Sequence, residues 1–142
     1  MSFSEHSLGH IAEVSSRLMN NRLNQRFNDN DIPVTAEQWA ILNILLEEDG
    51  LSQNKLARLA VKDHTSISRL IDHLIKKELV KRNTDPTDRR TKLIYVTEKG
   101  KELQLGVAQQ IQDQIAAELK GIDQASLQIC SDVLTQIIQN LK

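Results

Sequence analysis

Apolar residues recur at intervals of three and four along much of the chain, which is the spacing of a helix with one buried face. The first such stripe predicts a long amphipathic helix over residues 8–28, and it consists of Leu8, Ile11, Ala12, Val14, Leu18, Met19, Leu23 and Phe27. A stretch rich in Asn and Asp that ends in Pro33 breaks this helix, because proline cannot continue one. Thr35 and Gln38 then have the spacing of a capping box and predict a second helix, which Gly50 ends.

Residues 51–101 predict two short helices followed by a hairpin. Ser52 caps a helix over residues 53–60, a turn follows at residues 61–63, and a second helix covers about residues 65–78. Its buried stripe is Ile67, Leu70, Ile71, Leu74 and Ile75. Two runs with β-branched members, residues 79–83 and 92–97, predict strands that are joined by an eight-residue tip over residues 84–91.

The remaining chain predicts two more helices. Thr97 caps the first, which Gly121 ends, and Asp123 caps the second. Their apolar stripes are Leu103, Val107, Ile111, Ile115 and Leu119, and then Leu127, Cys130, Leu134, Ile137, Ile138 and Leu141. The small module formed by the two short helices and the hairpin can cover only part of the apolar stripes at the two ends of the chain. A soluble monomer rarely exposes so much contiguous apolar surface. We therefore expect a symmetric dimer.

These elements predict a fold that is mainly α with a small β-hairpin wing (α+β), a winged helix-turn-helix with N- and C-terminal dimerisation helices. The length of 142 residues suits a single domain, residues 1–142. Within it, residues 35–101 form the winged module, and residues 1–34 and 102–142 form the dimerisation helices.

The polar face of the second short helix carries hydroxyls, imidazoles and cations that fit the major groove of DNA. Arginine can bind guanine with two hydrogen bonds, and serine or threonine fit donor or acceptor edges. The candidates are His64, Thr65, Ser66, Ser68, Arg69, His73 and Lys76. A solvated polar face explains this pattern equally well when it is taken alone. Asp72 lies on the same face, and we expect it to orient Arg69 and Lys76.

The hairpin tip and the charge distribution favour the DNA-binding interpretation. Asp88, Arg89 and Arg90 stand in a tip longer than a plain hairpin needs, and arginine is attracted to narrow minor grooves. Residues 51–101 hold thirteen Lys and Arg against six Asp and Glu, a net charge of +7, while the rest of the chain carries −8. A basic module on an acidic body is typical of a nucleic-acid-binding protein.

At these residues the chain resembles the MarR family of bacterial transcription regulators. The resemblance rests on the run from His64 to Arg69, on the wing motif from Asp85 to Arg90, and on the run from Val96 to Gly100. It implies that Asp88 and Arg90 form the wing-tip pair, with Arg90 in the minor groove. It also implies a homodimer on a pseudo-palindromic operator and a small anionic or phenolic effector that binds between the dimerisation helices and the winged module.

Several other sites have simpler interpretations. His6 and His10 have the spacing of zinc ligands but lack a third ligand nearby, which favours a surface pair. Cys130 falls in an apolar stripe, which favours a buried core residue over a redox sensor. The sequence has no glycine-rich phosphate loop, no nucleophile paired with a base and no metal cluster, so we expect neither an enzyme nor a cofactor.

The sequence therefore predicts a DNA-binding transcription regulator whose partners are double-stranded DNA and a second copy of the chain. Repression is the expected output. A redox- or metal-responsive sensor on the same fold, and a winged helix used for protein contacts, are the alternatives. The absence of a long apolar run and of a signal-peptide pattern predicts a cytoplasmic protein with no membrane contact, and one cysteine suits a reducing compartment.

Overall fold

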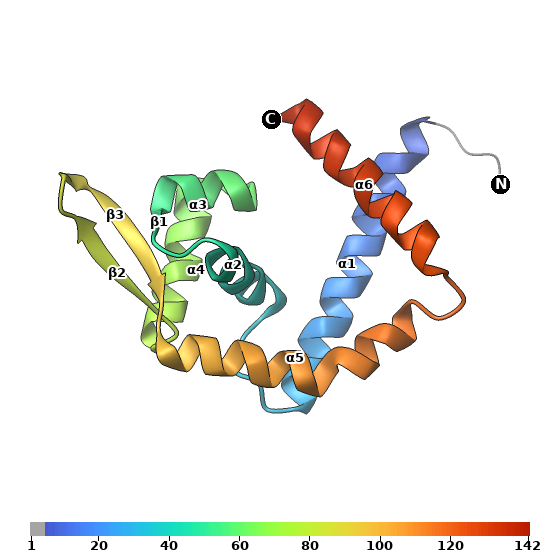
Figure 1. The fold of residues 1–142 in the computed structure, drawn as a ribbon, viewed down its shortest axis with the longest axis horizontal. Coiled ribbons are helices and arrows are strands. Elements are labelled where there is room, and N and C mark those ends of the chain that lie inside the picture. Colours follow the sequence, from blue (N-terminus) through green and yellow to red (C-terminus); the bar gives the residue numbers. More distant parts are fainter. Residues whose placement is uncertain (1–4) are drawn as a thin grey trace. The chain divides into compact units, whose positions relative to one another are not determined.

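The computed structural model describes residues 5–142, with side chains described from Ser7 onward. The elements in chain order are α1 (Glu5–Asp29), α2 (Ala36–Glu47), β1 (Leu51–Ser52), α3 (Gln53–Ala60), α4 (His64–Lys76), β2 (Val80–Asp85), β3 (Asp88–Val96), α5 (Glu98–Glu118) and α6 (Gln124–Leu141) (Figure 1). The chain forms two compact units, Met1–Ala108 and Gln109–Lys142, and their boundary falls within α5. The predicted fold class, mainly α with a small β wing, is confirmed.

The second helix begins at the predicted capping box, whereas α1 begins at Glu5, three residues before its predicted start. Thr35 caps α2 by accepting the backbone N–H of Gln38 at 3.2 Å, and the Gln38 side chain accepts the N–H of Thr35 at 3.3 Å. Asn24 of α1 accepts the N–H of Ala36 at 2.6 Å, which ties the end of α1 to the start of α2. Phe27 is buried and packs edge-on against Trp39, with ring centroids 5.8 Å apart. The turn after α1 is therefore held from both sides.

Ser52 caps the first helix of the helix-turn-helix as predicted, and Asp63, which was predicted only as part of the turn, caps the second. Ser52 accepts the N–H of Lys55 at 3.1 Å at the start of α3, and Asp63 accepts the N–H of Ser66 at 2.7 Å at the start of α4. Between them, Val61 ends α3 with φ of 52°. The left-handed backbone turns the chain sharply, although a β-branched residue adopts it at a cost. One face of α4 is buried, and it consists of Ile67, Leu70, Ile71 and Leu74.

The hairpin differs from its prediction, because the eight-residue tip does not exist. β2 and β3 pair in antiparallel fashion up to Asp85 and Asp88, with an irregularity between Thr84 and Asp85, so that only Pro86 and Thr87 lie between the strands. The polar composition of residues 84–91 suggested a loop, but strand pairing satisfies their backbone groups. The short strand β1, which was not predicted, pairs with the other end of β3, giving the sheet order β1-β3-β2.

Two further expectations were wrong. Gly50 does not end α2, which stops at Glu47; with φ of 71°, Gly50 instead makes the turn into β1, and its N–H donates to the Ile94 carbonyl at 3.0 Å. Cys130 is exposed, because α6 has no buried residue. The apolar stripe of α6 exists as a helix face, but the single chain does not bury it.

The end of α4, the hairpin base and the start of α5 meet around Leu79. The Leu79 carbonyl accepts the N–H of Thr97 at 3.0 Å, and the Thr97 hydroxyl donates to the Glu78 carbonyl at 2.7 Å while accepting the N–H of Gly100 at 3.1 Å. A Cβ at Gly100 would collide with the Leu79 carbonyl oxygen and would stand 2.7 Å from the nearest side-chain atom of Val96. Only glycine fits the first turn of α5 against this strand pair.

Asp72 does not contact the cations of its own helix. Its carboxylate pairs with Arg82 of β2, with 3.0 Å between Oδ1 and Nη2, and Arg82 also donates to the Gln53 side chain of α3 at 3.2 Å. The expectation that Asp72 orients Arg69 and Lys76 is therefore wrong. Helical spacing favoured those partners, but a guanidinium on the adjacent strand reaches the carboxylate instead. Arg82 thereby connects α3, α4 and β2.

Gly100→Ala should lower the free energy of unfolding by about 1–3 kcal/mol, because the added methyl overlaps backbone that has no room to move. Gly106→Ala is the matched control: it lies in the same helix with nothing within 4 Å of the added atom. It should raise stability by up to about 1 kcal/mol through helix propensity. Urea unfolding of both variants measures the difference, and equal effects would contradict a special role for the Leu79 junction.

The Asp72 and Arg82 pair should show a coupling free energy of about 0.2–1 kcal/mol in a double-mutant cycle, since both side chains retain contact with water. The cycle uses Asp72→Ala, Arg82→Ala and the double variant, each unfolded with urea at low salt and at 1 M NaCl, where the coupling should shrink. The control cycle pairs Asp72→Ala with Lys76→Ala and should give a smaller value. A larger coupling free energy between Asp72 and Lys76 than between Asp72 and Arg82 would show that Asp72 pairs with Lys76, as helical spacing favours.

Candidate nucleic-acid interface

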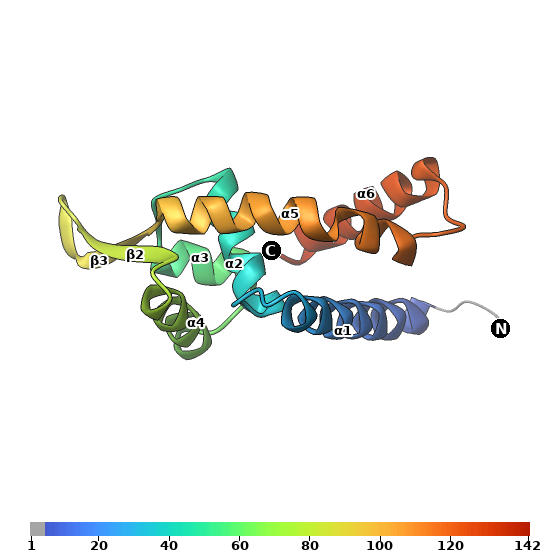
Figure 2. The ribbon, with the colours of Figure 1, turned by 90° about the horizontal axis from the view of Figure 1, so that it is seen from below.

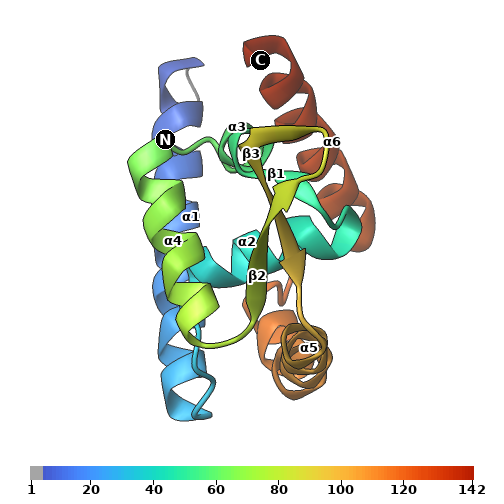
Figure 3. The ribbon, with the colours of Figure 1, turned by 90° about the vertical axis from the view of Figure 1, so that its left-hand side faces the viewer.

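The polar face of α4 forms one wall of an open groove at the end of the first unit. The groove has a volume of about 720 Å³, and it is lined by His64, Thr65, Ser68, Arg69, Asp72, His73, Ile75, Lys76 and Arg82. Six of the seven residues predicted on this helix therefore share one surface. The seventh, Ser66, lies half-buried at the edge of the helix and gives its N–H to the cap residue Asp63. Figure 3 shows α4 and the hairpin side by side at this end.

The charges along the groove are arranged so that cations remain available. Within the described part of the chain, neither Arg69 nor Lys76 forms an ion pair or a side-chain hydrogen bond, and both are exposed. The one carboxylate on this face, Asp72, is neutralised by Arg82. A phosphate that approaches the groove therefore meets free positive charge, and the repulsion expected from an isolated Asp72 is reduced.

The N-terminus of α4 is fixed by its cap. Hydrogen bonds from Ser66 lower the pKa of the Asp63 carboxyl, chiefly the bond from its backbone N–H. The cap is thus ionised at neutral pH and is weakened only as the pH falls through this lowered pKa. His64 and Thr65, in the first turn, are exposed just beyond it. The first turn of a helix that enters a major groove is the part that reaches the base edges.

The hairpin projects beyond the helices of the first unit (Figures 1 and 2). Asp88 accepts the backbone N–H of Arg90 at 3.0 Å and the hydroxyl of Thr91 at 3.1 Å, while Lys92 donates to the Thr84 hydroxyl across the strands at 2.9 Å. Asp88 therefore orders the backbone of Arg90 and does not bind its guanidinium. Arg89 and Arg90 are exposed, and among the described residues neither guanidinium has a partner.

The two-residue turn of the hairpin is held by Asp85. It accepts the backbone N–H of Thr87 at 2.9 Å and the Thr87 hydroxyl at 2.8 Å. These bonds, the backbone one foremost, lower the pKa of the Asp85 carboxyl. The turn thus presents Arg89 and Arg90 from a backbone that side-chain hydrogen bonds fix on both strands.

Sequence reasoning missed Arg82, which lines the groove and pairs with Asp72. The alternation of inward and outward residues along a strand could have predicted the position of Arg82. Arg82 and Val80 are two residues apart on β2, so they share a face of the strand, and Val80 is buried. A cation on the inward face of a strand beside a polar helix is expected to find a carboxylate there.

The described residues contain no group of three or more His, Cys, Asp or Glu that is placed to hold a metal ion. His10 is exposed, and the side chain of His6 lies outside the described ones, so the predicted pair stays a prediction. No helix in the described residues is long and apolar enough to cross a membrane.

The chain is similar to known transcription regulators in both sequence and structure. Residues 34–92 match the model of the MarR family. A proposed transcriptional regulatory protein for the hcr operon of Thauera aromatica is 32% identical over 97 residues, which cover 66% of this chain and 58% of that protein. This chain thus aligns with less than two-thirds of that relative.

Solved structures cover nearly the whole chain. The crystal structure of the transcriptional regulator SlyA is 26% identical and matches with a TM-score of 0.79, covering 94% of this chain and 92% of the other. A complex of MepR from S. aureus with DNA, 23% identical, shares the fold with a TM-score of 0.79 over 99% of this chain and 100% of the other. The family match places residues 34–92, the helix-turn-helix and most of the wing, in the MarR family, and the chain as a whole is similar to the regulator SlyA in sequence and structure.

Proposed function

We propose that the protein is a sequence-specific repressor that binds double-stranded DNA as a homodimer and responds to a small effector. The observation that carries this proposal is the combination of two free cationic elements at one end of the first unit, α4 with Arg69 and the hairpin with Arg89 and Arg90. A helix of 13 residues is about 20 Å long and fits a major groove about 12 Å wide. The projecting hairpin would then reach the adjacent minor groove.

The chemistry of the side chains suits α4 and the hairpin to different contacts with DNA. Arg69, together with Thr65 and Ser68, offers donors and acceptors to base edges. Arg89 and Arg90 would read the negative potential of a narrow groove and bind phosphates. The structure of MepR, which shares the fold, is a complex with DNA, and this supports DNA as the partner.

The homodimer is supported by the location of exposed apolar side chains. Most of the large exposed ones in the described part of the chain lie on α1, α5 and α6 or directly before α6: Ile11, Leu18, Met19, Leu105, Ile122, Ile129, Val133, Leu134, Ile138 and Leu141. These fall in residues 1–34 and 102–142, the proposed dimerisation helices. A second copy of the chain would remove them from water and would place two copies of α4 on successive major grooves.

Repression would follow from occupancy, because a dimer that spans two major grooves excludes other proteins from the same DNA. A small anionic or phenolic effector would act by binding differently to two spacings of the recognition helices. The effect on transcription is measured directly by adding the protein, with and without candidate effectors, to transcription from its own promoter in vitro.

Arg69→Ala should weaken binding to the selected operator by about 1–3 kcal/mol and should flatten the base preference at one position per half-site, if Arg69 binds a base edge. The operator is first obtained by footprinting the intergenic DNA beside the gene. Fluorescence anisotropy with the operator and with single-base variants then measures affinity, and titration at high DNA concentration gives the number of chains per duplex, expected to be two.

Arg17→Ala is the matched control, since Arg17 is an exposed arginine of α1 that pairs with Glu13. It should leave operator affinity unchanged. A uniform loss with Arg69→Ala on all sequences would reassign Arg69 to phosphate contact. Failure of the unsubstituted protein to bind any duplex in a salt-dependent way would favour the protein-contact alternative.

Arg90→Ala should weaken operators with A·T-rich flanks more than those with G·C-rich flanks, because a minor-groove arginine responds to groove width and potential. The footprint should shorten at both ends while the half-site spacing, about one helical turn, stays constant. The salt dependence of log Kd should fall by up to about two for the dimer, one for each charge removed. Footprinting and anisotropy at several salt concentrations measure these changes. Unchanged footprint ends, flank preference and salt dependence would mean that the wing does not touch DNA.

A further inference from the structure

The two histidines of α4 lie on opposite flanks of the helix face that carries Arg69. At about 100° per residue, His64 lies about 100° to one side of Thr65, and His73 lies about 80° to its other side. His64 is in the first turn of α4 and His73 is in the last, about 13 Å apart along the helix axis. Both imidazoles line the polar groove and are exposed.

The groove holds no free anion that could pair with these imidazoles. Among the residues that the structure describes, neither ring forms an ion pair or a side-chain hydrogen bond. The other charged residues in the groove lining are Arg69, Asp72 and Lys76 of α4 and Arg82 of β2, a net charge of +2. Asp72 already pairs with Arg82. The helices α2 and α3, which also pack against α4, contribute no residue to this lining.

The carboxylates near the start of α4 are also engaged. Glu37 of α2 pairs with Lys62 at 3.3 Å. Asp63 accepts the N–H of Ser66, and because this bond lowers the pKa of its carboxyl, the cap stays ionised at mildly acidic pH. Stronger acid would remove the cap and weaken the start of α4. That effect is opposite in sign to a gain of positive charge at the groove.

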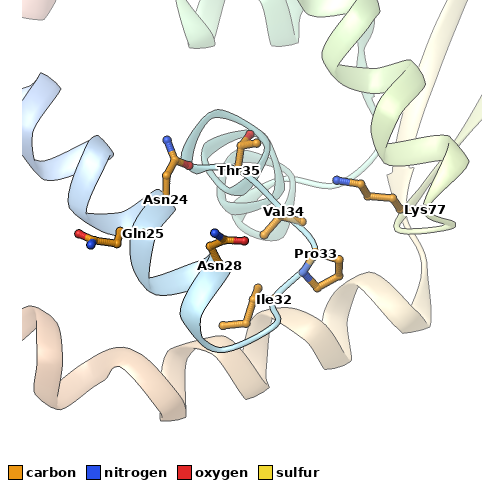
Figure 4. Close-up of a pocket in the computed structure, with 8 residues that line it drawn as sticks. All are labelled: Asn24, Gln25, Asn28, Ile32, Pro33, Val34, Thr35 and Lys77. Atoms are coloured by element: carbon orange, nitrogen blue, oxygen red, sulfur yellow. The ribbon is translucent and has the colours of Figure 1, made fainter.

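The cation that directly follows α4 is directed away from the groove. Lys77 extends toward the α1–α2 connection (Figure 4) and donates to the Gln38 side chain at 2.9 Å. It lines a second cavity of about 610 Å³, whose other walls come from α1, including Asn24, and from that connection. The last turn of α4 therefore offers only His73 and Lys76 as basic groups to an anion in the groove.

The positions of the two imidazoles suit phosphates better than bases. A helix in a major groove has the base edges in front of it and a sugar–phosphate backbone on either side. Residues at the centre of the inserted face reach the bases, whereas residues about 90° away face the two walls. An imidazolium ion forms a charged hydrogen bond with a phosphate oxygen, and this bond is stronger than that of a neutral imidazole.

We propose that His64 and His73 bind phosphates on opposite walls of the major groove as imidazolium ions, so that DNA binding takes up protons and strengthens as the pH falls. A phosphate stabilises the protonated ring beside it, and by linkage protonation stabilises the complex to the same extent. Imidazole is the side-chain group that ordinarily changes its charge between pH 5 and 8. The inference rests on the proposed function, because it requires α4 to lie in a major groove.

The expected effect is large enough to measure by fluorescence anisotropy with the operator. Each exposed pair of opposite charges should change affinity about two- to five-fold, and a homodimer carries four such imidazoles. Operator Kd should therefore fall at least about ten-fold between pH 8 and pH 5.5 at constant ionic strength. The salt dependence of log Kd should steepen over the same range by up to about four, one for each phosphate newly neutralised.

Two substitutions and a matched control assign the protons. Each of His64→Gln and His73→Gln removes a ring that can gain a proton, and each should remove about half of the pH dependence. The double variant should bind the operator with a Kd that varies less than about two-fold over this pH range. His10→Gln is the control, because His10 is an exposed histidine of α1 outside the groove, and it should keep the full pH dependence.

Imidazole NMR of the full-length protein, free and bound to the operator, reads the protonation of each ring directly. The rings of His64 and His73 should stay protonated to a higher pH in the complex than in the free protein. The ring of His10 should titrate alike in both.

Three outcomes would overturn the inference while DNA binding itself stands. They are an operator Kd that is constant from pH 8 to pH 5.5, a pH dependence that survives in the double variant, and tighter binding in acid without a steeper salt dependence. Failure to bind any duplex at every pH would instead overturn the proposed function.

Discussion

The carbonyl of Leu79 is the point on which the arrangement of the winged module depends. It accepts the N–H of Thr97 just after β3, and directly before it Glu78 adopts a left-handed backbone with φ of 63°. The chain can therefore leave α4, reverse and enter β2 within three residues. Because Gly100 has no side chain, α5 begins against the same backbone. The helix α4, the wing and α5 are thus positioned by backbone contacts, which tolerate little displacement.

Most local structure could be predicted from the sequence because it depends on local chemistry. Thr35, Ser52 and Asp123 cap the helices that their positions indicate. The buried stripe of α4 could also be predicted, because helical spacing fixes which residues share a face. The wing was misjudged since its polar, charged residues look like a loop, and only pairing across to β3 makes them strands. Such pairing depends on register between segments, which local composition does not contain.

The sequence predicted which residues of α4 face the groove, but it did not predict the ion pair between Asp72 and Arg82. The groove-facing residues of α4 follow from the helix period, whereas the partner of Asp72 depends on how close β2 comes to α4. The same limit applies to Cys130, because a stripe of apolar residues indicates a helix face but not what covers it. The second cavity was not predictable, since its walls come from three segments whose proximity is a property of the fold. Asn24 and Lys77 lie far apart in sequence and carry no shared pattern.

The glutamine at position 38 has a consequence that extends beyond capping. Its carbonyl oxygen accepts both the Thr35 N–H and the Lys77 ammonium, and the side chain is only 5% exposed. Glutamate serves in a capping box as well as glutamine does, but here it would give Lys77 a permanent internal counter-ion. The neutral amide maintains the bond between α2 and the end of α4 while leaving the lysine charge uncancelled. A single oxygen-for-nitrogen difference thus separates a closed structural ion pair from a cation that can still attract an external anion.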